Sequence, residues 1–136
     1  MRQKILVVDD EPDAREALLC VLNPIAEIIE AANGEEALRR IGADRPDLVL
    51  LDIAMPGLGG LDVLAAGLRI APRMIVVMLT CESDIAVAKE ALDKGARAYI
   101  TKPVDPLRLR GELSDILGMS AKAEDPESKT PWRVVG

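Results

Sequence analysis

The aliphatic run Leu48–Leu51, which ends at Asp52, constrains the fold more than any other stretch of the chain. An uninterrupted run of this kind is typical of a strand buried on both faces of a parallel sheet. Residues 55–57 (Met-Pro-Gly) end it, because proline removes a backbone donor and glycine permits turn conformations. A carboxylate at the end of such a strand must reach solvent or a ligand. We therefore expect Asp52 at the sheet edge where open α/β folds bind ligands.

Short aliphatic runs alternate with helical segments along most of the chain. Proline suits the first turn of a helix at position 12, and glycine is a plausible helix end at positions 42 and 95. We expect strands at 5–8, 27–31, 48–52, 74–79 and 97–100, and helices at 12–22, 35–41, 61–70, 83–94 and 106–117. This alternation predicts a doubly wound α/β domain with a parallel five-stranded sheet and right-handed crossovers.

The predicted domain covers residues 1–118. Residues 119–136 are polar, contain Pro126 and Pro131 and show no periodicity. We expect them to form a disordered C-terminal tail.

Composition excludes several classes of protein. The net charge of −6 argues against direct nucleic-acid binding, which needs clustered Lys and Arg. No apolar stretch is long enough for a membrane span, and Asp9 and Asp10 interrupt the only apolar run near the N-terminus, so we expect no secretory signal. Cys20 and Cys81 lack metal-site spacing and the chain has no histidine. We expect free thiols in a cytoplasmic protein.

Polar residues follow four of the predicted strands. Asp9 and Asp10 follow the first, Asp52 ends the third, Thr80 ends the fourth, and Lys102 follows the fifth. In a parallel sheet these ends converge on one crevice, where the carboxylates repel each other. A hard cation relieves that repulsion, and oxygen ligands without His or Cys suit Mg²⁺. A carboxylate nucleophile, a metal, a lysine and a hydroxyl together predict a site for a transferred phosphoryl group.

The chain resembles the receiver domains of two-component response regulators, of the chemotaxis-regulator type. The resemblance covers residues 4 to about 118 and rests on residues 5–12 (ILVVDDEP), 50–57 (LLDIAMPG) and 95–103 (GARAYITKP), with Thr80 after an apolar strand. It implies a flavodoxin-like strand order of 2-1-3-4-5.

The resemblance implies that Asp52 accepts phosphate from a phosphohistidine on a sensor histidine kinase or a histidine phosphotransfer protein. Asp9, Asp10 and Asp52 would hold Mg²⁺, together with the backbone carbonyl of Ala54. Lys102 would pair with the phosphoryl oxygens.

The resemblance also implies a switch. Thr80 would hydrogen-bond a phosphoryl oxygen, and Tyr99 would turn inward as Thr80 moves. The Lys102–Pro103 bond is usually cis in this family, and only X-Pro bonds take that form cheaply.

Some residues depart from the family pattern. Cys81 stands where members usually carry a very small residue, so we expect narrower access to the phosphate. Arg97 and Ala98 stand where many DNA-binding members carry two acids used in dimerisation, and Val104 replaces a frequent Phe. We therefore do not expect that type of dimer. No effector module follows Leu117, so we expect output through a downstream protein effector or an output domain absent from this chain.

Other classes fit less well. A flavodoxin needs a Ser/Thr/Gly-rich phosphate loop where this chain has Asp9-Asp10-Glu11. A haloacid-dehalogenase-type phosphatase wants a second Asp at the position of Ala54, and a phosphate-independent pseudo-receiver normally lacks part of the acidic set. A metal-dependent aspartyl-phosphate phosphatase remains the alternative to a non-enzymatic receiver.

Overall fold

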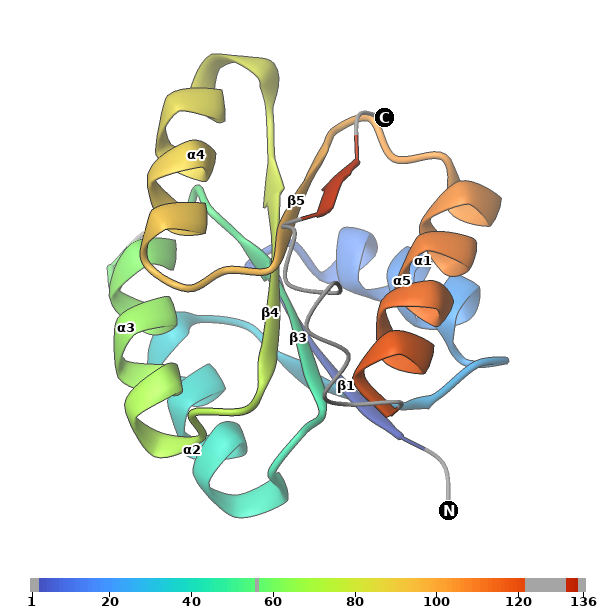
Figure 1. Ribbon diagram of the computed structural model, residues 1–136, viewed down its shortest axis with the longest axis horizontal. Coiled ribbons are helices and arrows are strands. Elements are labelled where there is room, and N and C mark those ends of the chain that lie inside the picture. Colours follow the sequence, from blue (N-terminus) through green and yellow to red (C-terminus); the bar gives the residue numbers. More distant parts are fainter. Residues whose placement is uncertain (1–2, 56, 122–131, 135–136) are drawn as a thin grey trace.

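A parallel sheet of strand order β2-β1-β3-β4-β5-β6 forms the centre of the structure (Figure 1). This computed structural model describes residues 3–55, 57–121 and 132–134, with side chains as far as Gly118. The strands are β1 (Lys4–Val8), β2 (Glu27–Ala31), β3 (Leu48–Asp52), β4 (Ile75–Thr80), β5 (Ala98–Thr101) and β6 (Trp132–Val134). The first five strands confirm the predicted order 2-1-3-4-5.

Helices cover both faces of the sheet, as the doubly wound prediction requires. Figure 1 shows α2 (Gly34–Asp44), α3 (Gly60–Ile70) and α4 (Ile85–Asp93) on one face, and α1 (Pro12–Leu22) and α5 (Pro106–Ala121) on the other. A short 3₁₀ helix, η1 (Glu82–Asp84), precedes α4.

The central strand β3 shows why the sequence pattern was informative. All five of its residues are buried. Val49 and Leu51 belong to the apolar cluster under α2, α3 and α4, whereas Leu48 and Leu50 belong to the cluster under α1 and α5. Because successive side chains of a strand point to opposite faces, a strand covered on both sides must be aliphatic at every position. Asp52 is the first residue of β3 that is not aliphatic.

Two helix boundaries differ from the prediction. Helix α2 runs through Gly42 to Asp44, and Arg45 ends it in a left-handed conformation with φ of 49°. A glycine within a helix costs only about 1 kcal/mol, so position 42 did not force a stop. The segment predicted as one helix at 83–94 begins as η1 and becomes α4 only at Ile85.

Parts of the C-terminal segment, which was predicted to be a disordered tail, have regular secondary structure. Helix α5 continues through Met119 to Ala121, and Trp132–Val134 form β6, which pairs with β5. Three residues are too few to carry a readable strand pattern, and pairing depends on the open side of β5. Residues 122–131, 135 and 136 lie outside the described part of the chain.

Candidate phosphoacceptor site

Three carboxylates meet at the carboxyl edge of the sheet. Oxygens of Asp9, Asp10 and Asp52 all lie within 4.8 Å of one another. The loops after β1 and β3 hold two of them, because the N–H of Glu11 donates to Asp9 Oδ1 at 3.0 Å and the N–H of Ala54 donates to Asp52 Oδ1 at 3.1 Å. Asp9 and Asp52 are buried, whereas Asp10 is exposed. The structure thus brings together the three acids that the sequence placed at strand ends.

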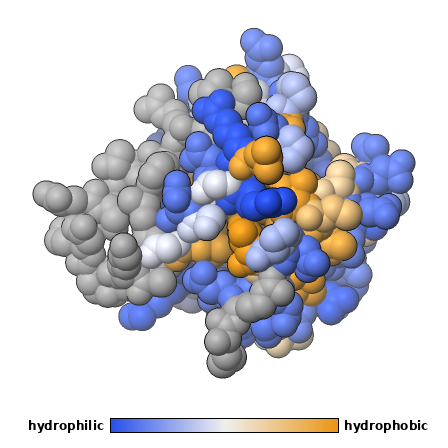
Figure 2. All heavy atoms as spheres, turned by 90° about the vertical axis from the view of Figure 1, so that its right-hand side faces the viewer, coloured by the Kyte–Doolittle hydropathy of each residue, from blue (hydrophilic) through white to orange (hydrophobic). Residues whose placement is uncertain are grey.

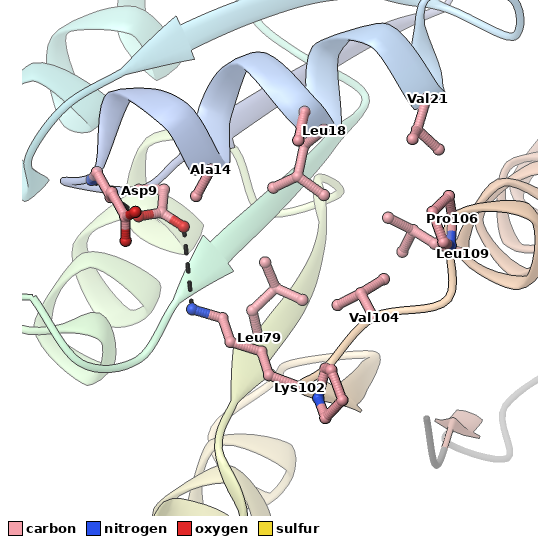
Figure 3. Close-up of a pocket in the computed structure, with 12 residues that line it drawn as sticks. Asp9, Ala14, Leu18, Val21, Leu79, Lys102, Val104, Pro106 and Leu109 are labelled. Atoms are coloured by element: carbon pink, nitrogen blue, oxygen red, sulfur yellow. Dashed lines mark hydrogen bonds and ion pairs between the residues drawn. The ribbon is translucent and has the colours of Figure 1, made fainter.

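Lys102 faces this acidic cluster from the loop after β5. Its Nζ lies 3.3 Å from Asp52 Oδ2. The same Nζ lies 3.9 Å from Asp9 Oδ2, and Figure 3 shows this second pair. Within the described residues, the buried Asp9 Oδ2 has no hydrogen-bond partner. One ammonium group therefore faces three carboxylates, which leaves the cluster short of positive charge.

The pKa of Asp52 is raised above its ordinary value. Burial is the main cause, and the charge of Asp9 adds to it, while Lys102 and the N–H of Ala54 lower the pKa and offset only part of the rise. An ionised carboxylate in this position is therefore held at an energetic cost, which a bound cation would relieve.

Thr80 lies at the end of β4, beside the end of β3. The neighbouring strands remain paired here, since the N–H of Ile53 donates to the carbonyl of Leu79 at 2.9 Å. Thr80 is buried, and its hydroxyl donates to the carbonyl of Cys81 at 3.0 Å. Cys81 is exposed, and its Sγ lies 3.0 Å from Ser83 Oγ and 3.2 Å from Asp84 Oδ2. The hydroxyl that we expect to reach phosphate bonds to its own loop in this structure.

Tyr99 is buried on β5, where it pairs with Met78 of β4. It belongs to the same apolar cluster as Ala88 and Ala91 of α4. Its ring thus already lies inside the fold, next to the helix that follows Thr80.

A pocket of about 320 Å³ opens beside the acidic cluster, between α1 and the segment from β5 to α5. Figure 3 shows Asp9 and Lys102 pointing toward each other at one end, and Val21 and Leu109 at the other. The Lys102–Pro103 bond at its border is cis, as the resemblance implied. The lining residues are Asp9, Glu11, Ala14, Ala17, Leu18, Val21, Leu79, Lys102, Pro103, Val104, Pro106 and Leu109.

The same side of the molecule has an apolar surface. Figure 2 shows hydrophobic atoms reaching the surface in a patch bordered by hydrophilic residues. The sequence did not predict this pocket, because most of its lining residues are ordinary apolar residues from segments far apart in the chain.

Arg15 is a further residue that the sequence analysis missed. From α1 its Nη1 donates to the carbonyl of Asp9 at 2.7 Å, and its Nε lies 3.4 Å from Glu30 Oε1. Arg15 thereby fixes the backbone of the loop that carries Asp9 and Asp10. No sequence signal could have found it, because the contact depends on how α1 lies across the sheet.

The family follows from comparison with known proteins. The response regulator receiver domain profile matches residues 5–114. The chain belongs to this family. Over 112 residues the receiver is 42% identical to the DNA-binding response regulator MtrA of Mycobacterium tuberculosis, covering 80% of this chain and 48% of that protein. Over 123 residues it is 39% identical to the probable transcriptional regulator ycf27 of Porphyridium aerugineum, covering 90% of this chain and 51% of that protein. The receiver thus spans about half the length of these relatives.

Solved structures agree with this assignment. The receiver domain of NtrX from Brucella abortus is 35% identical, with a TM-score of 0.80 over 85% of this chain and 98% of that one. A CheY-like receiver domain protein from Methanospirillum hungatei is 29% identical, with a TM-score of 0.86 over 91% and 100%. Among the described residues, no helix is both long and apolar enough to span a membrane.

Proposed function

We propose that Asp52 is the phosphoacceptor of this receiver. An Asp52 oxygen attacks the phosphorus of a phosphohistidine on a histidine kinase or phosphotransfer protein. The new O–P bond forms as the P–N bond breaks, and the released imidazole takes a proton from solvent. The observation that carries the proposal is the position of Asp52, buried at the end of β3 with Lys102 Nζ 3.3 Å away.

The acidic cluster also fits a magnesium ion. Its ligands would be Asp9, Asp10 and Asp52 with the backbone carbonyl of Ala54, a set of hard oxygen donors that suits Mg²⁺. The buried Asp9 Oδ2, which lacks a hydrogen-bond partner among the described residues, supports this fit. When bound, Mg²⁺ would supply charge neutralisation for the phosphoryl oxygens near Asp52.

This proposal gives the receiver a stoichiometric role rather than an enzymatic one. Incubation with acetyl phosphate and Mg²⁺ should add at most one phosphoryl group per chain, followed by slow release. The phosphatase alternative instead predicts many turnovers of a phosphomonoester such as p-nitrophenyl phosphate. Sustained turnover that Asp52→Ala abolishes would overturn the non-enzymatic assignment.

The pocket beside Lys102 is positioned to receive the phosphodonor protein. Its largely aliphatic lining leads directly to Asp9 and Lys102 (Figure 3). Ala17→Lys places a long charged side chain in this exposed lining, so it should slow transfer from a phosphohistidine protein and leave acetyl phosphate labelling unchanged. Ala65→Lys, at an exposed alanine of α3 on the opposite face, is the matched control. Equal transfer rates for both variants would show that the phosphodonor protein binds elsewhere.

Output would pass through Thr80 and Tyr99 to the surface formed by α4, β5 and α5. Thr80 would exchange its bond to the Cys81 carbonyl for one to phosphate, which shifts the population of states that a partner or output domain reads. Thr80→Ala should still accept phosphate but lose most phosphorylation-dependent binding. Chemical-shift changes on phosphorylation should cluster around Lys89, Tyr99 and Arg108; changes confined to the acidic loops, with output intact, would contradict this face.

With a net charge of −6, the receiver would act through protein partners in the cytoplasm, without direct contact to nucleic acid or membrane.

A further inference from the structure

The strand β6 occupies an edge of the sheet that would otherwise be open. It pairs in parallel with β5 through the register Ala98↔Trp132, Tyr99↔Arg133 and Ile100↔Val134. An edge strand exposes a row of backbone donors and acceptors that other chains can pair with. β5 is also the strand that carries Tyr99, so whatever pairs with this edge lies beside the proposed output surface.

The register fixes which backbone groups are involved. The N–H of Lys102 donates to the carbonyl of Thr80 in β4 at 2.8 Å. Because successive peptide groups along a strand face opposite sides, those of Ala98 and Ile100 also face β4, whereas those of Tyr99 and Thr101 face β6. In the pairing of Tyr99 with Arg133, the peptide groups of Trp132 and Val134 then face β5.

We propose that residues 132–134 form an intramolecular cap on the β5 edge. A polypeptide that adds a strand to β5 must first displace this segment, so the cap is an autoinhibitory contact. The proposal goes beyond phosphotransfer and does not require Asp52 to be phosphorylated.

Chain connectivity favours this occupant over a second copy of the chain. Helix α5 ends at Ala121, and the residues between it and Trp132 number ten. Ten residues can extend about 33 Å, which is ample to reach the neighbouring strand. A short tether also gives the segment a local concentration on the order of millimolar, which a separate chain rarely reaches.

Amide hydrogen exchange of the full chain tests the cap. Val134→Pro removes the N–H that the register directs toward β5, whereas Val134→Ala keeps it and serves as the matched control. Exchange at Tyr99 and Thr101 should become about tenfold faster in the proline variant, the effect of losing roughly one hydrogen bond. Exchange at Ile100, which faces β4, and at Leu50 in β3 should stay unchanged and show that the fold is intact.

Two outcomes would overturn the proposal. Equal exchange at Tyr99 and Thr101 in the wild-type chain and in Val134→Pro would show that β6 does not protect β5. Protection that rises with protein concentration would show that the segment pairs between copies of the chain instead of within one.

Discussion

The charged residues at the two edges of the sheet differ in burial and in hydrogen bonding. At the amino edge, Asp47 Oδ2 accepts from the N–H of Lys4 at 2.8 Å, and Arg45 Nη1 donates to the carbonyl of Ile70 at 2.8 Å. Each of these charged groups bonds a backbone group and lies near solvent. At the carboxyl edge, Asp9 and Asp52 are buried beside each other, and Asp9 Oδ2 has no hydrogen-bond partner in the described part of the chain.

The contrast shows where the chain keeps unsatisfied charge. A charged side chain that forms a hydrogen bond with a backbone group contributes to stability and requires no ligand to complete it. Buried like charges cost stability, and such an arrangement is expected where a ligand completes it. The contrast supports the proposed functional role of the carboxyl edge and a structural role for the amino edge, although the same residue types occur at both.

The largest expected effect is a difference in phosphorylation rate between lysine variants at the two edges of the sheet. Lys102→Ala removes the ammonium beside Asp52 and should slow phosphorylation by acetyl phosphate about 100-fold, because it deletes a charge that stabilises the transferred group. Lys4 at the amino edge points its Nζ at the carbonyl of Asp44, so Lys4→Ala should leave the rate unchanged. The initial rates of phosphorylation by acetyl phosphate should be compared between the two variants. Equal rates would show that Lys102 does not take part in the reaction.

A smaller effect concerns metal binding. Mg²⁺ at tenfold its dissociation constant should raise the free energy of unfolding by about 1.4 kcal/mol, because it binds the folded state alone. Asp10→Asn should lose this gain, whereas Asp47→Asn should keep it, since only Asp10 belongs to the acidic cluster. Urea unfolding with and without Mg²⁺ measures both. A full gain in Asp10→Asn would show that the ion binds elsewhere.

The smallest effect concerns the folded state without metal. Asp47→Asn should lower the free energy of unfolding by about 1 kcal/mol, through the weakened bond from the N–H of Lys4. Asp52→Asn should raise it at neutral pH, because burial makes the ionised carboxylate unfavourable. Unfolding in chelator measures both changes, and destabilisation by Asp52→Asn would contradict the charge argument.

The pH dependence follows from the raised pKa of Asp52. Between the ordinary value of 3.8 and the raised pKa, the folded state holds a proton that the unfolded chain has lost. Wild-type stability therefore falls as pH rises through this window, and the cost is complete above it. The advantage of Asp52→Asn should be greatest at neutral pH and shrink as pH falls toward 4.

The sequence predicted five strands and the meeting of the acids because both depend on simple rules. A strand covered on two faces must be aliphatic, as Leu48–Leu51 is, and the carboxyl ends of parallel strands meet at one edge. Strand order came from the resemblance to receivers, since the aliphatic pattern alone does not say which strands pair.

Other features depend on packing that no local pattern encodes. Arg15 reaches Asp9 only because α1 lies across the sheet, and Arg45 rather than Gly42 ends α2 because the backbone turns left-handed there. The β6 pairing requires the open side of β5, and the pocket requires α1 and α5 to lie side by side.

The central claim is that Asp52 accepts the phosphoryl group. Treatment with acetyl phosphate and Mg²⁺, reduction of the acyl phosphate with borohydride, and mass-spectrometric mapping would locate the modified residue. We predict modification at Asp52 alone, its loss in Asp52→Ala or in excess chelator, and its retention in Asp47→Ala. Modification at another residue of the wild-type chain, or undiminished labelling of Asp52→Ala, would contradict the account.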